Sequence, residues 1–174
     1  HPQGSSHGDG RIFRFTYPEP EYVAMAGLAR AGWEDLARRA GRPLLALAGN
    51  WDCGPAESPE LAALVRTLEA RGLRYELLDA AESNARFSWF RLAAGSRALF
   101  QPDGGVAFAD RALAALWSEV QRAGAEIVTE DPAVTIEPAG ERVTVATASG
   151  RRLVGGRLIV AAGAWSRTLG ESLG

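Results

Sequence analysis

Apolar residues recur along the chain at two different spacings, which predicts alternating helices and strands. Steps of three and four residues predict a helix from Glu19 to Ala40, ended by Gly41 and Pro43. The expected buried stripe of this helix comprises Tyr22, Met25, Ala26, Ala29, Trp33 and Leu36. The segment just before it, 11–15, alternates, so that Ile12 and Arg14 should face away from Phe13 and Phe15 if the segment is extended.

A strand and a second helix follow in the pattern. The apolar run from Leu44 to Cys53 predicts a strand. Ser58 has the side chain of an N-cap, Pro59 suits the first helical position, and Gly72 suits a left-handed C-terminal residue. The expected buried face of this helix comprises Leu61, Leu64, Val65 and Leu68.

The rest of the chain continues the alternation. Two more helices are predicted, a short one at Ala80–Arg86 and a longer one at Ala109–Ala123. The inner face expected for the longer helix comprises Ala109, Leu113, Leu116 and Val120. Further strands are predicted at Tyr75–Leu78, within 87–100, and at Ala125–Val128, Ala133–Glu137, Arg142–Thr147 and Arg157–Ala161. The order predicts an α/β framework interrupted by an α+β insertion at about 42–106.

Composition and charge exclude several classes of function. The 174 residues, 47% of them hydrophobic, suffice for one domain with a core or for parts of two. The 19 basic residues, all Arg, against 21 acidic ones argue against a nucleic-acid or anionic-membrane partner. No apolar run approaches the roughly 18 residues that span a bilayer, and no signal peptide is visible. The lone Cys53 excludes an intramolecular disulfide, and we expect a cytoplasmic protein.

The two ends of the sequence suggest an internal piece of a longer protein. The chain opens on His1 in a polar stretch rich in Gly and Ser, and it stops on Gly174 where a helix is predicted to begin. With only two His and one Cys, the sequence predicts no metal site.

Three places could carry chemistry. Gly4–Arg14 combines small residues, which let backbone approach a ligand, with His7 and two arginines, although a solvated polar loop explains the same residues. Arg157–Trp165 is consistent with a buried parallel strand running into an Ala-Gly-Ala tip, or with a plain core strand. Phe100–Gly105 favours a tight turn in which Asp103 is a turn residue.

These motifs, taken in order, resemble the monomeric sarcosine oxidase and N-methyltryptophan oxidase family. The resemblance is carried by Gly4-Ser5-Ser6-His7-Gly8-Asp9 with Arg11-Ile12 and Arg14, by Tyr17, Glu19-Pro20 and Tyr22-Val23, by Gly54-Pro55, by Phe100-Gln101-Pro102-Asp103, and by Val160-Ala161-Ala162-Gly163-Ala164-Trp165. It covers essentially the whole chain. The last motif is shared across the wider group of glycine and D-amino acid oxidases.

The resemblance implies a fold and a reaction. A Rossmann-like FAD-binding domain, incomplete here, would comprise 1–41 and 107–174, and part of a substrate-binding domain would comprise 42–106. The family oxidises the C–N bond of secondary amino acids with FAD, and dioxygen is reduced to hydrogen peroxide. The implied partners are therefore a small secondary amine and dioxygen, with no nucleic acid and no membrane. The oligomeric state stays open.

The resemblance also implies site residues. His7 and Arg11 would lie beside the flavin ring as catalytic residues, and Arg14 would hold the substrate carboxylate. The cofactor would be contacted by Ser5, Ser6, His7, Arg11, Ala133, Ala162 and Gly163. The contact at Ala133 would be through backbone.

The chain departs from the family pattern in three respects. Gly10 replaces the usual Ser or Thr, and the glycine-rich pyrophosphate turn is not in this sequence. The third departure is the part of the family that carries its oxygen-activating lysine, a second carboxylate-binding lysine and the flavin-linked cysteine: this sequence contains no lysine, and Cys53 does not match that cysteine. The alternatives are therefore a non-catalytic remnant or fragment, a glycine oxidase or dehydrogenase of the wider group, and a binding or structural protein without a cofactor.

Overall fold

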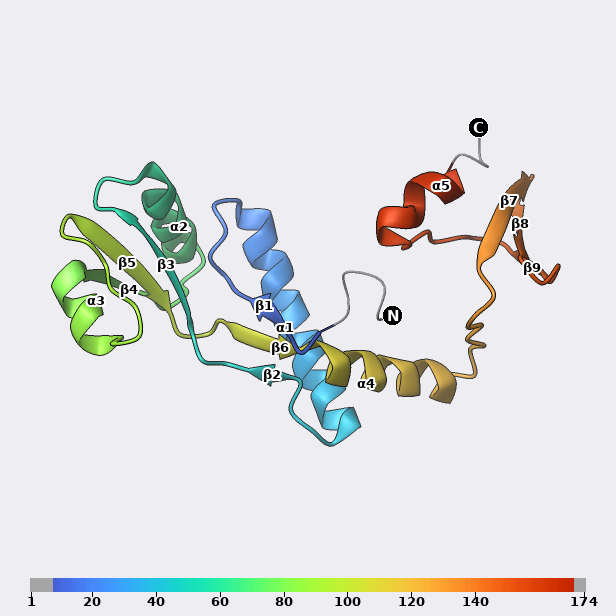
Figure 1. The fold of residues 1–174 in the computed structure, drawn as a ribbon, viewed down its shortest axis with the longest axis horizontal. Helices are drawn as coiled ribbons and strands as arrows, with labels where there is room; N and C mark the ends of the chain where they lie inside the picture. The colour runs from blue at the N-terminus through green and yellow to red at the C-terminus, as the bar shows by residue number, and fades with distance from the viewer. Residues whose placement is uncertain (1–7, 171–174) are drawn as a thin grey trace. The chain divides into compact units, whose positions relative to one another are not determined.

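The computed structural model describes residues 8–170, which fall into two compact units, 8–116 and 117–170. Helices and strands alternate along the chain (Figure 1). The mixed α/β character predicted from the sequence is confirmed.

The first unit contains two three-stranded antiparallel sheets. One has the order β1-β6-β2, formed by Gly10–Phe13, Gly105–Phe108 and Leu45–Ala46. The other has the order β3-β5-β4, formed by Asn50–Pro55, Ser96–Gln101 and Glu76–Asp79. In the first sheet Arg11 pairs with Ala107, and in the second Asp52 pairs with Leu99.

Local capping explains where the helices of this unit begin and end. α1 spans Pro20–Ala40 and ends at Gly41, which is left-handed (φ 64°). α2 spans Pro59–Ala70, and its N-cap Ser58 accepts a hydrogen bond from the Leu61 N–H. α3 spans Ala80–Arg86 and begins with a capping box between Asp79 and Glu82. α4 spans Ala109–Arg122, and its residues up to Leu116 belong to this unit.

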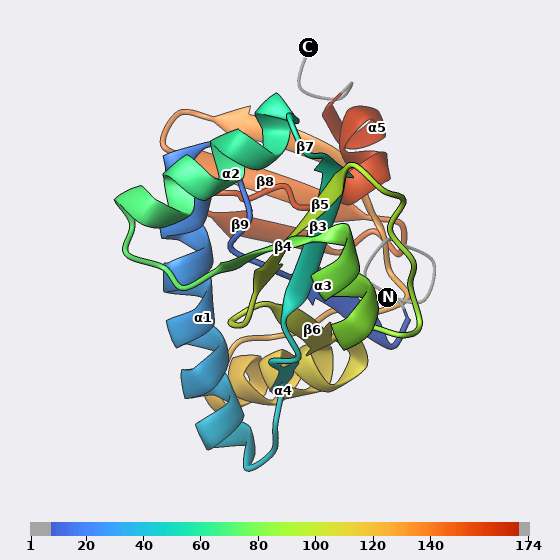
Figure 2. The same cartoon turned by 90° about the vertical axis from the view of Figure 1, so that its left-hand side faces the viewer.

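The main core of the first unit lies between the β1 segment, α1, α2 and β5. Its buried members are Phe13, Phe15, Val23, Ala26, Leu61, Leu64, Leu68 and Leu99. Leu68 and Leu99 are fully buried, and burying one such side chain contributes about 1.5–3 kcal/mol. A smaller cluster joins Leu36, Leu44 and Ala115. Figure 2 shows the three helices α1, α2 and α3 around the strands β3–β5.

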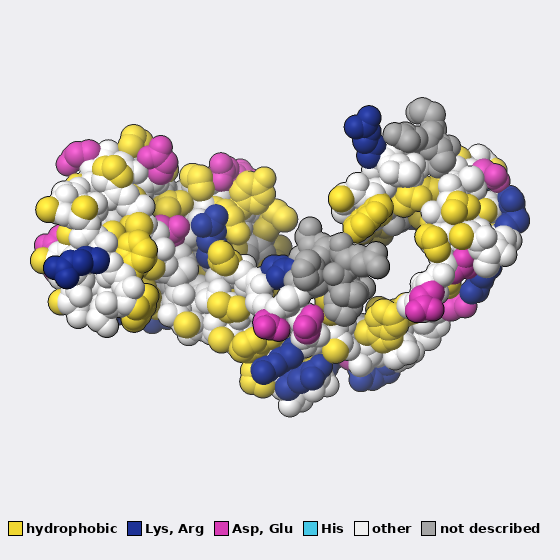
Figure 3. Space-filling model, viewed as in Figure 1, with side chains coloured by type: hydrophobic (Ala, Val, Ile, Leu, Met, Phe, Trp, Pro, Cys, Tyr) yellow, Lys and Arg dark blue, Asp and Glu magenta, His cyan; other side chains and the backbone are white. Residues whose placement is uncertain are grey.

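The second unit is built on an antiparallel meander. β7 (Ala133–Ala139), β8 (Arg142–Thr147) and β9 (Arg152–Gly155) pair in sequence order. A short 3-10 helix, η1 (Gly163–Trp165), leads into α5 (Ser166–Gly170). Ile136 and Thr147 are buried within this unit. The space-filling view in Figure 3 shows apolar side chains at the surface of the chain. Val134 and Val154 are among the exposed ones.

The strand predicted at 44–53 is in fact two strands. Gly49 is left-handed (φ 83°), and its N–H donates a hydrogen bond to the Gly104 carbonyl, so the chain changes direction there. As a result β2 pairs with β6, whereas β3 pairs with β5. The strand β6 itself was not predicted, because its four residues form no distinctive pattern.

Two predicted buried faces are also wrong in part. On α1, Tyr22 and Met25 are exposed and the buried side chains are Val23, Ala26 and Leu36. On α4, the inner face is formed by small residues, Ala109, Ala112 and Ala115, whereas Leu116 and Val120 are exposed. Alanines allow the close approach of neighbouring backbone. The small volume of these side chains, and not their hydrophobicity, therefore decides which face of α4 is buried. The predicted buried face of α2 is confirmed at Leu61, Leu64 and Leu68.

Two predicted strands of the second unit do not form. Ala125–Val128 has no regular structure, and neither does Arg157–Ala161, where Ile159 is 90% exposed. A strand needs a hydrogen-bonding neighbour, and no strand lies beside either segment among residues 8–170. Instead, Arg152–Gly155 pairs with β8, because the tight turn at Ser149–Gly150 returns the chain directly. Within the described part of the chain, no helix has both the length and the apolar character to cross a membrane.

Candidate functional site

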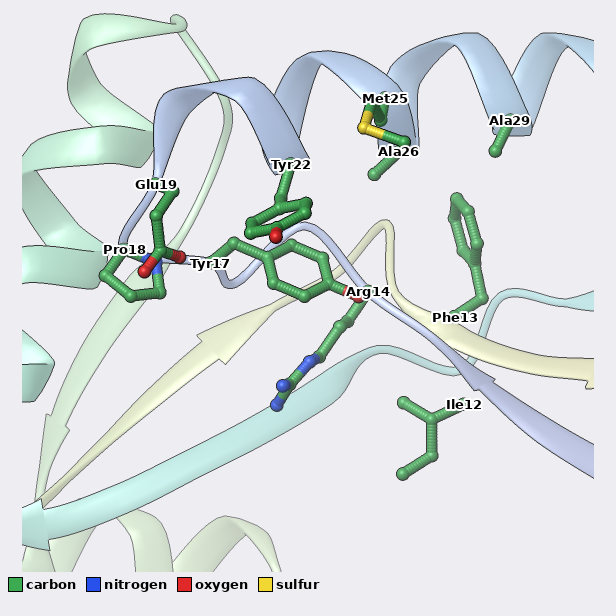
Figure 4. A pocket seen from close by; sticks show the side chains of 10 residues that line it. All are labelled: Ile12, Phe13, Arg14, Tyr17, Pro18, Glu19, Tyr22, Met25, Ala26 and Ala29. Carbon is green, nitrogen blue, oxygen red and sulfur yellow. The ribbon is translucent and has the colours of Figure 1, made fainter. Parts of the chain in front are cut away.

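A groove of about 590 Å³ opens between the segment that follows β1 and the first turns of α1. It is lined mainly by apolar and aromatic side chains: Ile12, Phe13, Arg14, Tyr17, Pro18, Glu19, Tyr22, Met25, Ala26 and Ala29. Figure 4 shows the rings of Tyr17 and Tyr22 near the Arg14 side chain, with Met25 and Ala29 on the helix above. Among the described residues that line the groove, only Arg14 and Glu19 are charged. The exposed side chains of α1 that contradicted the predicted stripe therefore form one wall of this groove.

Arg14 is the cation of the groove, and two neighbours restrain it. Its Nη1 lies 3.6 Å from Oδ1 of Asp52 on β3. Its Cζ lies 5.0 Å from the centre of the Tyr17 ring, which is a cation–π distance. The guanidinium extends toward β3 in Figure 4 and is 41% exposed, so it can still meet a ligand. A guanidinium in a mostly apolar groove is suited to binding a carboxylate through paired N–H donors.

Asp52 is itself held by a short chain of hydrogen bonds. Asn50 Nδ2 donates to Asp52 Oδ2 at 2.6 Å and to Thr16 Oγ1 at 3.0 Å. Thr16 is 1% exposed and lies two residues after Arg14. Gly104 packs against Asn50 so closely that an added methyl group would overlap the amide. The segment that carries Arg14 and the strand that carries Asp52 are thus joined by buried polar contacts.

A second groove, of about 430 Å³, shares Arg14 with the first. Its lining is Arg14, Thr16, Pro18, Asp52, Pro59, Glu60, Ala63 and Leu64. Glu60 adds a second carboxylate there, and the hydrogen bond from the Ser58 hydroxyl lowers its pKa. The acidic character of this second groove makes it a poor site for another anion.

Arg11 occupies a different position from Arg14. It lies within β1, its side chain is exposed, and its Nη1 donates a 2.7 Å hydrogen bond to the Gly10 carbonyl. It does not line the groove that contains Arg14. Arg11 and Arg14, which the sequence groups together, therefore have different surroundings, and of the two Arg14 alone lines this groove.

The predicted turn residue Asp103 is the centre of an ion-pair cluster that sequence reasoning missed. Its Oδ1 accepts hydrogen bonds at 3.0 Å from Arg30 of α1 and from Arg74, and its Oδ2 accepts one from Gln101. Burial alone would raise the pKa of Asp103, but the two guanidinium groups outweigh it and lower that pKa. Asp103 does lie at the turn between β5 and β6, and its partners far away in sequence give it a structural role as well.

The remaining predicted cofactor contacts divide between two places. Ser5, Ser6 and His7 lie outside the described residues. In the second unit, Ala133 begins β7 and pairs with Thr147, while Ala162 precedes η1 and Gly163 is its first residue. Gly163 is left-handed (φ 54°), and no atom of its surroundings lies within 4 Å of where a Cβ would be. Backbone here is open to close approach by a flat or extended ligand, which fits a cofactor contact.

Among residues 8–170, no three His, Cys, Asp or Glu side chains gather closely enough to hold a metal ion. Of the residues that shape the site, sequence reasoning missed Tyr17 and Asp52 as partners of Arg14, and Asn50, which donates a hydrogen bond to Asp52. Tyr17 carries a weak signal, an aromatic residue three positions after an arginine. Asp52 carries none, because its contact with Arg14 joins two distant segments.

Comparison with known proteins matches the whole chain, residues 1–174, to the family described as DAO, FAD dependent oxidoreductase. Peroxisomal sarcosine oxidase of Mus musculus is 34% identical over 174 residues, which are 100% of this chain and 44% of the relative. N-methyl-L-tryptophan oxidase of Salmonella arizonae is 32% identical, over 99% of this chain and 46% of that protein. The chain therefore spans less than half the length of these relatives.

Among solved structures, NikD, an amino acid oxidase essential for nikkomycin biosynthesis, matches with a TM-score of 0.86. The two chains are 26% identical, and the match covers 98% of this chain and 44% of the NikD chain. The similarity in fold thus extends over nearly all of the chain.

Proposed function

Because this chain belongs to the FAD-dependent oxidoreductase family, we propose that it forms part of an enzyme that oxidises the C–N bond of a secondary, N-methyl amino acid such as sarcosine. The family match confirms FAD, the cofactor predicted from the sequence. In the proposed reaction dioxygen is the final acceptor and is reduced to hydrogen peroxide. The two relatives named sarcosine oxidase and N-methyl-L-tryptophan oxidase support this substrate class.

The observation that carries the proposal is the placement of Arg14. Its guanidinium lies in a groove that is otherwise mostly apolar, and it is partly exposed. Every amino acid presents a carboxylate, and a single fixed cation in a groove with aromatic walls can bind that group. A charge-assisted pair of hydrogen bonds to Arg14 would fix the carboxylate and thereby orient the carbon next to nitrogen.

The flavin, when bound, supplies the hydride acceptor. In our proposal Arg11 and His7 lie beside its ring, where Arg11 stabilises the negative charge of reduction and His7 handles a proton. Ser5 and Ser6 would contact the same cofactor. Ala133, Ala162 and Gly163 contribute backbone contacts, for which the open surroundings of Gly163 are suitable. The corresponding Rossmann-like domain would comprise 1–41 and 107–174, and 42–106 would belong to the substrate-binding domain.

The proposal is tested by expressing the chain within its complete coding sequence and recording its visible absorption. We expect a flavin spectrum that bleaches anaerobically when sarcosine or another N-methyl amino acid is added, with peroxide formed once air is admitted. Bleaching without reoxidation by dioxygen would indicate a dehydrogenase instead of an oxidase. A folded but colourless protein would contradict the proposal and favour the non-catalytic alternative.

A further inference from the structure

We propose that Asp52 is a positioning residue that orients the Arg14 guanidinium for the substrate carboxylate. The inference rests on the proposed function, since it assigns a carboxylate to Arg14. It concerns a residue 38 positions away from Arg14. Asp52 lies on β3, which ends in the family motif Gly54-Pro55, but Asp52 itself belongs to no family motif in this sequence.

The ion pair engages only part of the guanidinium. The contact with Asp52 is made through Nη1, at 3.6 Å. A guanidinium has five N–H donors, so a contact at one nitrogen leaves donors for a second carboxylate. The separation exceeds the 2.7–2.9 Å or so of a tight charge-assisted hydrogen bond. Asp52 therefore restrains the direction of Arg14 without saturating it.

The restraint is built into a closed circuit of contacts. Arg14 forms an ion pair with Asp52, and Asp52 accepts a hydrogen bond from Asn50. Asn50 donates a second hydrogen bond to Thr16, which is nearly adjacent to Arg14 in the chain. Asp52 is 22% exposed and Thr16 is 1% exposed, so these bonds are shielded from water far better than a surface pair. The Tyr17 ring adds a further restraint on the same guanidinium. Such a fixed cation loses little conformational entropy when it binds a ligand.

The charge of Asp52 could in principle act in the opposite way, by competing with the substrate for Arg14. The geometry favours positioning, because Asp52 lines the second groove with Glu60 and does not line the groove that contains Tyr17 and Tyr22. Its negative charge is thus displaced from the side on which the substrate carboxylate would bind. These two roles predict opposite changes in substrate affinity when the charge is removed.

The test is Asp52→Asn in the full-length holoenzyme, assayed with two matched substrates. One is an N-methyl amino acid, and the other is the N-methyl amine that lacks the carboxylate. We expect KM for the amino acid to rise about fivefold or more, with kcat within about twofold and with the amine unaffected. The matched control is Asp35→Asn, which removes a carboxylate paired with Arg38 and Arg39 on the outer face of α1 and should change neither KM.

A second readout does not depend on turnover. Propionate binding can be followed by titration calorimetry. In Asp52→Asn its affinity should fall by about the same factor as KM for the amino acid rises. In Thr16→Val, which removes the acceptor for Asn50, the affinity should fall by a smaller factor. Unchanged or tighter propionate binding, or an equal loss with the amine substrate, would overturn the positioning role. If the unmodified protein oxidises no secondary amino acid but Asp52→Asn still weakens propionate binding, the proposed function fails while the role of Asp52 stands.

Discussion

Arg30 and Asp103, which are 73 positions apart in the sequence, meet in a hydrogen-bonded ion pair with 3.0 Å between Nη1 and Oδ1. The pair joins the middle of α1 to the turn between β5 and β6. Arg74 reaches the same oxygen from the segment after α2, so three parts of the first unit converge on one carboxylate. Because Asp103 is only 16% exposed, this pair lies in a region where water weakens it less than at the surface.

Asp103→Asn should therefore destabilise the first unit by about 1–2 kcal/mol at neutral pH, since two guanidinium groups lose their shared partner. The lowered pKa of Asp103 means that the folded protein holds its charge more firmly than the unfolded chain does. The resulting stabilisation is present above the ordinary value of 3.8 and is lost as the pH falls through the lower, folded pKa. Thermal unfolding across the acid range should show a shallower loss of stability in the variant, and Asp35→Asn serves as the exposed control.

Arg14→Met should raise KM for an N-methyl amino acid by about 30-fold or more while the flavin stays bound, because the charge-assisted bonds to the carboxylate are lost. Methionine retains a long apolar side chain, so the wall of the groove is kept. Steady-state kinetics together with the flavin absorption spectrum check this prediction. Arg38→Met, on the exposed side of α1, is the matched control, and equal kinetics for both variants would remove Arg14 from the site.

Leu68→Ala should cost about 2–5 kcal/mol of unfolding free energy, because the side chain is fully buried in the main core and its removal leaves a cavity. Leu28→Ala on α1 is the comparison, since Leu28 is 76% exposed. Denaturant unfolding measures both. A loss of similar size for the two variants would contradict the assigned core.

Gly49→Ala should be more destabilising than Gly72→Ala, although both glycines are left-handed, with φ of 83° and 62°. A methyl group at Gly49 would overlap the Phe100 ring, whereas nothing lies within 4 Å of the corresponding position at Gly72. We expect backbone strain of about 1 kcal/mol in both variants and an added steric cost of about 1–3 kcal/mol at Gly49. Equal midpoints of thermal unfolding would show that Phe100 can move aside freely.

Local signals in the sequence predicted the helices well. The Ser58-Pro59 start of α2 and the glycine stop of α1 act within a few residues, so they can be recognised without knowledge of the fold. The predicted strands at 125–128 and 157–161 do not form. A strand depends on a hydrogen-bonding neighbour strand, which no local pattern specifies. The same holds for α4, where the partners Leu36 and Leu44 select small side chains for its inner face.

Only those residues of the candidate site that belong to a local sequence motif could be predicted. Arg14 was identified through the residues around it, and the structure places it in a groove with aromatic walls. The assignments of Arg11, Ala133, Ala162 and Gly163 to the cofactor stay predictions. Asp52 and Asn50 were not foreseen, because their contacts with Arg14 and Thr16 arise only when two segments far apart in sequence come together.

The two kinds of sheet in this chain also differ in how their strands find one another. In the β7–β8–β9 meander each strand pairs with the next across a tight turn, as when Ala139 faces Arg142. In the first unit Gly10 must reach Phe108 before β1 and β6 can pair. Closing so long a loop costs entropy that only the finished contacts repay. The meander should therefore acquire protection from hydrogen exchange early during refolding, and the sheet that carries Arg11 should acquire it late.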